Sequence, residues 1–191
     1  YFLIRSPLKY LSAFFATFFG TLGSFNFFFG FLGIFPKSVR FAYEIQKEEI
    51  SHVHAHFANH PALAASIIWR LIGIPYSFTA HGSDLHKDQT MLCEKIEHAQ
   101  FVVTVSEFNR RFMLEHCPEA PSGKIHVIHC GVDSGQFPAK EHEEKESPRI
   151  ICVASFEEVK GHRYLVEACA LLSSEGTDFR CFLIGSGPQE K

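Results

Sequence analysis

The feature that most constrains this chain is a run of 25 residues, Leu11–Phe35, without a single charged side chain. A helix needs about 20 apolar residues to cross the hydrocarbon core of a bilayer, so this run is long enough to span a membrane. It also fits a helical hairpin, broken around Gly20–Asn26, whose Phe-rich faces pack on a domain or enter the lipid interface. Disorder is a third interpretation. We expect residues 1–40 to form a hydrophobic helical segment that is either membrane-associated or folded as a hairpin. Basic residues flank the run on both sides and predict no orientation: Arg5, Lys9, Lys37 and Arg40.

Charge and cysteine content narrow the possible partners and the compartment. The chain has 18 Lys and Arg against 21 Asp and Glu, a formal net charge of −3. Capture of nucleic acid needs clustered basic side chains, which this chain lacks, so we expect no nucleic-acid partner. The six cysteines form no C-x-x-C pair, and most stand in apolar surroundings. We therefore expect small buried thiols in a reducing compartment rather than a disulfide framework.

Beyond residue 40 the pattern changes to alternating helices and strands, which predicts an α/β fold with parallel sheets. A first domain at 41–134 and a second at 149–191 are separated by a polar linker at 135–148. In the first domain Ser106 is placed to cap the helix that follows the third strand. The second domain begins with a strand–helix–strand unit, which implies a parallel pair. The predicted strands are 51–57, 75–79, 101–105, 124–129, 149–154 and 179–184, and the main helices are 41–49, 61–72, 91–99 and 162–174.

Four histidines lie in or just after the first predicted strand: His52, His54, His56 and His60. Alternate side chains of a strand share a face, so the first three line one face of the sheet. Ligands of open α/β sheets bind at the carboxyl ends of strands, close to His54 and His56. Three interpretations remain open, namely polar contacts to a substrate, a structural role, or a metal site.

Further candidates lie in loops that follow predicted strands. His81 follows the second strand, where an imidazole can donate a hydrogen bond or move a proton near neutral pH, although it could instead cap a turn. Lys160 precedes a predicted helix whose free N–H groups suit a phosphate, although a solvated surface lysine is the alternative. Gly185 and Gly187 follow the last strand, where they allow a ligand to approach the backbone. Alone they are not a dinucleotide fingerprint.

Together these segments resemble the family-4 glycosyltransferases of the GT-B fold. The resemblance covers about residues 40–191 and is greatest to members that build bacterial exopolysaccharide or lipopolysaccharide. The matching strings, in the family's order and spacing, are His54-Ala-His56-Phe-Ala, Gly73 through Asp84, Val103 through Asn109, Lys124 through Asp133, Lys160-Gly-His, Leu165-Val-Glu-Ala168 and Gly185-Ser-Gly187-Pro.

The resemblance implies two Rossmann-like domains facing across a cleft, with the acceptor mainly on the first. His81 corresponds to the family's catalytic histidine, which is expected to contact the transferred sugar near its reacting carbon. We place four further residues on the acceptor or cleft side: His54, His56, Asp84 and Ser106. Members of the family are retaining and need no metal or other cofactor. The implied partners are a nucleotide-sugar donor, a lipid-linked or polysaccharide acceptor, and the cytoplasmic face of the inner membrane.

The nucleotide-sugar donor is expected mainly on the second domain. There Lys160 corresponds to the lysine that holds the donor diphosphate, and Gly185 and Gly187 to the turn near the nucleoside. Ser155 stands where many members carry an arginine as a second diphosphate ligand. One positive charge at the donor site is therefore lost or supplied from elsewhere.

The resemblance also places family segments outside this sequence. The first strands of the acceptor domain precede Tyr1, and the E-x7-E segment that holds the donor follows Lys191. We therefore expect a chain truncated at both ends, inactive alone but part of an enzyme. The alternatives are a nucleotide-sugar epimerase, which shares the GT-B architecture, a metal-dependent hydrolase built on the histidine cluster, or an inactive membrane-associated remnant.

Overall fold

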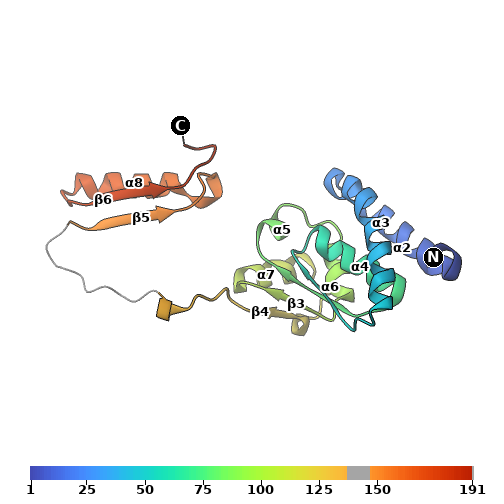
Figure 1. The fold of residues 1–191 in the computed structure, drawn as a ribbon. Helices are drawn as coiled ribbons and strands as arrows, with labels where there is room; N and C mark the ends of the chain where they lie inside the picture. Colours follow the sequence, from blue (N-terminus) through green and yellow to red (C-terminus); the bar gives the residue numbers. More distant parts are fainter. Residues whose placement is uncertain (137–146, 191) are drawn as a thin grey trace. The chain divides into compact units, whose positions relative to one another are not determined.

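The computed structural model of the protein describes residues 1–136 and 147–190 and divides the chain into two compact units, Tyr1–Val132 and Asp133–Lys191 (Figure 1). Most of the predicted linker, residues 137–146, lies outside the described residues.

The Phe-rich segment forms a helical hairpin. A short helix α1 (Phe2–Arg5) precedes α2 (Pro7–Thr21) and α3 (Phe25–Lys47), so the break falls inside the predicted interval. Ser24 caps α3, because its hydroxyl oxygen accepts a hydrogen bond from the Phe27 backbone N–H at 3.2 Å. Within the described ranges, none of the helices combines the length and the apolarity that crossing a bilayer requires.

Four parallel strands form the sheet of the first unit, in the order β1-β2-β3-β4. They are β1 (Val53–His56), β2 (Tyr76–Ala80), β3 (Phe101–Thr104) and β4 (Ile125–Val127). The connecting helices are α4 (His60–Ile72), α5 (Ser83–His86), α6 (Leu92–His98) and α7 (Glu107–His116), and a short 3-10 turn, η1 (Ser122–Lys124), leads into β4. The prediction of an α/β fold with a parallel sheet is confirmed.

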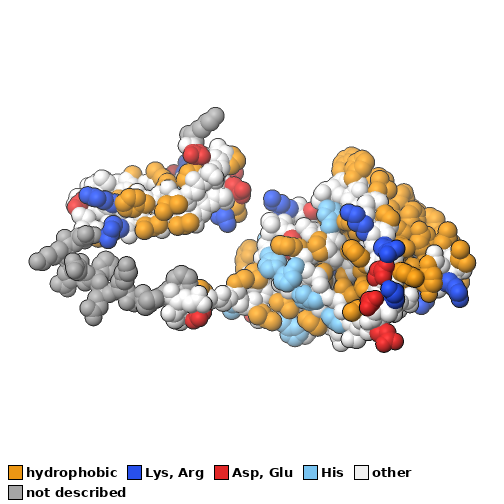
Figure 2. Space-filling view, in the orientation of Figure 1, with side chains coloured by type: hydrophobic (Ala, Val, Ile, Leu, Met, Phe, Trp, Pro, Cys, Tyr) orange, Lys and Arg blue, Asp and Glu red, His pale blue; other side chains and the backbone are white. Residues whose placement is uncertain are grey.

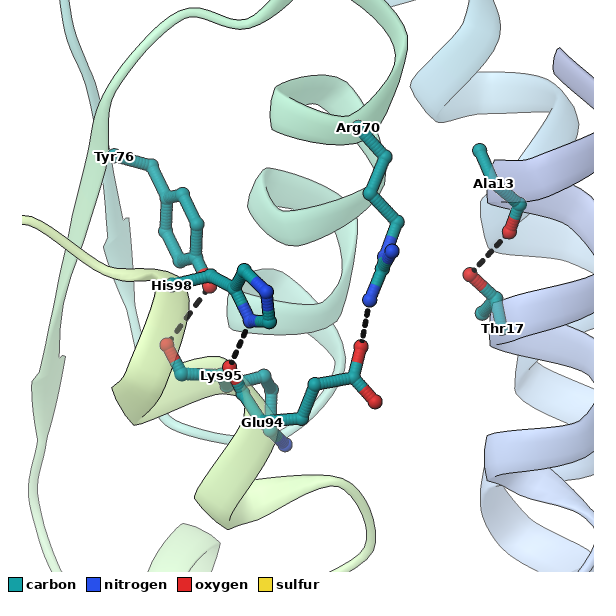
Figure 3. A network of polar contacts seen from close by, with 7 residues as sticks. All are labelled: Ala13, Thr17, Arg70, Tyr76, Glu94, Lys95 and His98. Carbon is teal, nitrogen blue, oxygen red and sulfur yellow. Dashed lines mark hydrogen bonds and ion pairs between the residues drawn. The ribbon is translucent and has the colours of Figure 1, made fainter. Parts of the chain in front are cut away.

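Helix α4 joins the hairpin to the sheet, since it packs on α2 and α3 and also on β1 and β2. A polar network ties α4, β2 and α6 together beside the hairpin (Figure 3). The Tyr76 hydroxyl donates to the carbonyl oxygen of Lys95 at 2.8 Å, and Arg70 pairs with Glu94. Burial raises the pKa of Tyr76, so this phenol stays a neutral hydrogen-bond donor.

The expectation for the cysteines is wrong in two respects. Cys93, in α6, and Cys117, just after α7, form a disulfide across 24 residues of sequence. Of the free cysteines, Cys130 and Cys181 are exposed rather than buried. This pairing has no local signal, because a C-x23-C spacing matches no common framework and the two cysteines belong to different parts of the fold.

The second unit contains β5 (Arg149–Val153), α8 (His162–Ser174) and β6 (Arg180–Ile184), and its two strands pair in parallel as predicted. Two 3-10 turns, η2 (Ser134–Gln136) and η3 (Glu158–Lys160), complete the described elements.

Candidate functional site

The loop after β2 holds His81 at the carboxyl edge of the sheet and fixes its backbone from both sides. The backbone N–H of His81 donates to Asp84 Oδ1 at 3.1 Å. Its carbonyl oxygen accepts a hydrogen bond from Asn109 Nδ2 at 2.7 Å. Because both backbone groups have side-chain partners, the position of the His81 imidazole depends on residues of two other elements, α5 and α7.

Asp84 acts through the backbone rather than as a free carboxylate. Its side chain is only 6% exposed. Besides His81, its oxygens accept hydrogen bonds from the Gly82 N–H and from the Ala58 N–H, each at 2.7 Å. Hydrogen bonds from several N–H groups satisfy a buried carboxylate, and here they join the loop after β1 to the loop after β2. Asp84 is therefore placed to position His81.

Helix α7 supplies the other half of this support. The predicted cap at its start is confirmed, because Ser106 Oγ accepts from the Asn109 backbone N–H at 3.2 Å. The Asn109 side chain is buried and also contacts His86 Nε2 through its Oδ1 at 2.9 Å. No pattern in the sequence predicts this contact of Asn109 with the loop that carries His81.

The imidazoles of His56 and His81 form a pair above the edge of the sheet. His56 Nδ1 lies 3.2 Å from His81 Nε2, and the two rings are within 21° of parallel. In such a hydrogen bond one nitrogen carries the proton and the other accepts it, so the protonation of one ring determines the tautomer of the other. The Phe57 ring lies 4.9 Å from the His81 ring and covers it on one side. The contact with His56 therefore orients the ring of His81.

His54 has a different environment from His56. Its two ring nitrogens contact hydroxyls of β2, Nδ1 with Ser77 at 2.7 Å and Nε2 with Thr79 at 2.9 Å. Burial, followed by repulsion from His56 and His52, lowers the pKa of His54. These surroundings therefore favour the neutral form of the imidazole on the face of the sheet. Across residues 1–136 and 147–190, no three His, Cys, Asp or Glu side chains come together as a metal site.

In the second unit the loop after β5 leads into α8. Lys160 ends η3, is exposed, and directly precedes Gly161, the N-cap residue of α8. The first N–H groups of a helix lack intrahelical partners, so a cation beside them can join them in binding a phosphate. Ser155 is exposed in the same loop.

Gly185 and Gly187 follow β6 and contact the loop after β5. Their φ values are 157° and 156°, which side chains with a Cβ rarely adopt. A Cβ on Gly185 would lie 1.9 Å from the Ala154 carbonyl oxygen, and one on Gly187 would lie 2.6 Å from the Phe156 carbonyl oxygen. These glycines are therefore required by the close approach of two backbone segments. From the sequence we expected these glycines to let a ligand approach the backbone, whereas in the structure another backbone segment occupies that space.

Family models of glycosyltransferases match both parts of this chain. Residues 18–136 match the family model described as Glycosyltransferase Family 4, which is more than half of the chain. Residues 133–191 match the model described as Glycosyl transferases group 1. The chain belongs to glycosyltransferase family 4. Its four-stranded parallel sheet and its β5–α8–β6 unit fit the Rossmann-like domains of a GT-B glycosyltransferase, as predicted.

One curated relative is a protein of Escherichia coli (strain K12) named as a colanic acid biosynthesis glycosyltransferase, WcaL. It is 38% identical to this family-4 chain over 72 residues, which cover 37% of the chain and 18% of the relative. The chain thus matches less than a fifth of that protein's length.

The second unit of this family-4 chain also has a hollow of about 750 Å³ beside α8. It lies between α8 and the segment after β6, and Lys160 and Ser155 are not among its lining residues. His162 lines it and is buried, with no hydrogen bond to its Nδ1 from the described residues.

Proposed function

We propose that the protein is a retaining, metal-independent glycosyltransferase that transfers a hexose from a nucleotide-diphosphate sugar to a lipid-linked or polysaccharide acceptor. Membership of family 4 supports a transferase. The name of the E. coli relative, which assigns that protein to colanic acid biosynthesis, supports a polysaccharide pathway. The observation that carries the proposal is His81, held by Asp84 and Asn109 at the carboxyl edge of a parallel sheet. Ligands bind at this edge in open α/β folds.

In this proposal His81 contacts the transferred sugar. Its backbone is fixed before any substrate binds, so little orientation is lost when the sugar binds. The hydrogen bond between His56 and His81 holds the imidazole of His81 in one orientation for its contact with the sugar. Asp84 and Asn109 are positioning residues, because they hold the backbone of His81 and do not themselves contact the sugar.

Lys160 would act on the donor. The leaving nucleoside diphosphate gains negative charge in the transition state, and a fixed cation beside a helix N-terminus stabilises that charge. The exposed position of Lys160, immediately before α8, supports this role. Ser155 and the glycine turn after β6 would complete the donor side, with the glycines allowing the turn to pack closely on the loop after β5.

The experiment for His81 compares His81→Ala with His126→Ala in the full-length protein. His126 is a matched control, because it is an exposed histidine on β4 of the same sheet. We expect His81→Ala to lower turnover about 100-fold or more with donor affinity kept, since acid–base and positioning groups contribute at least that much. Turnover is measured as transfer of labelled sugar from a panel of nucleotide sugars to a lipid extract. Equal turnover in the two variants would rule out the role of His81.

The experiment for Lys160 measures affinity for nucleoside diphosphates by calorimetry. Lys160→Ala should weaken binding about tenfold or more, as expected for loss of a charge-assisted hydrogen bond, while Lys160→Arg retains most of it. Arg163→Ala removes the same charge from an exposed site on α8 and is the control. Unchanged affinity in Lys160→Ala contradicts the assignment.

A separate assay of the full-length protein without any acceptor tests the epimerase alternative. Conversion of the sugar of the nucleotide sugar under these conditions would indicate an epimerase.

A further inference from the structure

The outward side of the helical hairpin carries a continuous apolar surface that no other described element covers. Its large apolar side chains recur every three or four residues, so they lie on one side of each helix. Ring contacts from Phe19 through Phe18 and Phe28 to Phe29 connect the two helices. Figure 2 shows hydrophobic side chains gathered over this part of the first unit. We call this surface the hairpin face, and its residues are Leu8, Leu11, Phe15, Phe19, Leu22, Phe25, Phe29 and Leu32.

The opposite side of the hairpin is locked onto the α/β unit, so the hairpin face cannot turn inward. A Cβ on Gly20 would meet Met91 Sδ at 2.7 Å, and one on Gly30 would meet His60 Nε2 at 2.5 Å. These two glycines let both helices approach the domain closely. At the turn, Ser24 also donates a hydrogen bond to Asp88 Oδ2 at 2.5 Å. The exposure of the hairpin face is therefore a fixed property of this packing.

Charge distinguishes the kind of partner that this surface fits. In a chain with a net charge of −3, residues 1–43 contain four basic side chains and no acidic one; the next residue, Glu44 of α3, forms an ion pair with Arg40, so Arg5, Lys9 and Lys37 carry the charge argument. The basic residues lie away from the turn between α2 and α3, at Arg5, Lys9, Lys37 and Arg40, whereas the turn carries apolar Leu22 and Phe25. The hairpin thus has apolar side chains at its turn and lysines and arginines away from the turn. These two regions match the acyl and headgroup regions of an anionic lipid surface.

We propose that the hairpin face docks on an anionic lipid surface, with the turn and the exposed phenylalanines at the acyl boundary and the basic residues among the headgroups. The proposal rests on the proposed function only in that a lipid-linked acceptor would lie in the same surface. It requires no spanning helix and no sugar donor.

Flotation with lipid vesicles tests the proposal on the full-length protein. We expect binding to vesicles of phosphatidylcholine mixed with phosphatidylglycerol, and weaker binding to phosphatidylcholine alone or at high salt. Phe19→Ser with Phe29→Ser should weaken partitioning about 100-fold or more, since two phenyl rings lose their burial in lipid. Phe108→Ser is the matched control. Phe19, Phe29 and Phe108 are each 64% exposed, and Phe108 lies on α7 instead.

A second variant keeps the test decisive if the double substitution does not fold. Lys9→Glu with Lys37→Glu should abolish the preference for anionic vesicles, with an unchanged circular dichroism spectrum. Equal losses in Phe108→Ser and in the hairpin variant overturn the proposal, as does wild-type protein that binds neither vesicle. A wild-type oligomer that the hairpin substitutions convert to monomers would also overturn it, because the face would then bind a second copy. Vesicle binding needs no turnover, so failure here and failure of the proposed transferase activity are distinguishable.

Discussion

Lys95 provides the sharpest test of the packing, because it is a charged residue in the core of the first unit. Its side chain is 1% exposed. The ammonium donates a hydrogen bond to the Ala58 carbonyl oxygen at 2.7 Å and lies 4.9 Å from the centre of the Phe27 ring. Burial lowers the pKa of Lys95 to about 7, although Asp88, Glu94 and Asp84 act in the opposite direction.

This pKa predicts a pH dependence of stability. In the unfolded chain the lysine has its ordinary pKa of 10.5, so between pH 7 and 10.5 the unfolded state binds more protons than the folded state. The free energy of unfolding therefore rises with pH in that window, by up to about 1.4 kcal/mol per pH unit. From pH 7 to pH 9 the gain from Lys95 is about 2 kcal/mol. Below pH 7 both states carry the proton, and the contribution of Lys95 is constant.

Urea unfolding at pH 7, 8 and 9 measures this gain when the wild type is compared with Lys95→Met. Trp69 is the only tryptophan in the chain and lies in α4, so its fluorescence reports on the first unit alone. We expect the stability difference between wild type and Lys95→Met to change by about 2 kcal/mol over this range in favour of the wild type. Lys87→Met, at an exposed lysine after α5, should leave the pH dependence unchanged. Parallel pH profiles for wild type and Lys95→Met would refute the reasoning.

Three further predictions follow from contacts in the two units. Asn109→Ala removes the side-chain bond to the carbonyl of His81, so it should lower turnover about tenfold with donor affinity kept, and an unchanged rate in the sugar-transfer assay would contradict this. Gly185→Ala places a Cβ 1.9 Å from a backbone oxygen, so it should destabilise the second unit by about 2 kcal/mol or more, measured by hydrogen exchange in β5 and β6. Reduction of the disulfide between Cys93 and Cys117, which closes a loop of 24 residues, should lower stability of the first unit by about 3 kcal/mol in urea unfolding; an unchanged midpoint would count against it.

Much of the fold could be predicted because its signals are local. The β-branched run at 101–105 predicts a buried strand, and the structure has β3 at Phe101–Thr104. Ser106 followed by a helical pattern predicts an N-cap, which the structure contains. The break in the Phe-rich segment could be predicted from its small residues, because glycine and serine interrupt a helix more readily than phenylalanine does. Each of these features depends on a few neighbouring residues.

The support of the candidate site could be predicted only in part. His81 and Asp84 follow one strand and could each be predicted as candidate site residues, but the three backbone groups that Asp84 holds include the Ala58 N–H of another loop. Asn109 could be predicted as part of a helix start, yet its side chain crosses to the carbonyl of His81. Contacts of this kind depend on the register between strands and helices, which the pattern of a single segment does not contain.

Lys95 shows most clearly how distant parts of the sequence determine a residue's environment. Its own segment, Cys-Glu-Lys-Ile-Glu-His, has the composition of a solvent-facing helix, and nothing there predicts burial. The burial arises because Phe27 of the hairpin covers the ammonium, while Ala58 accepts its hydrogen bond. The backbone of Ala58 in turn donates to Asp84, which holds His81. The hairpin and the loop that carries His81 are thus joined through one buried lysine, so the hairpin helps to position the candidate site even before any lipid surface is considered.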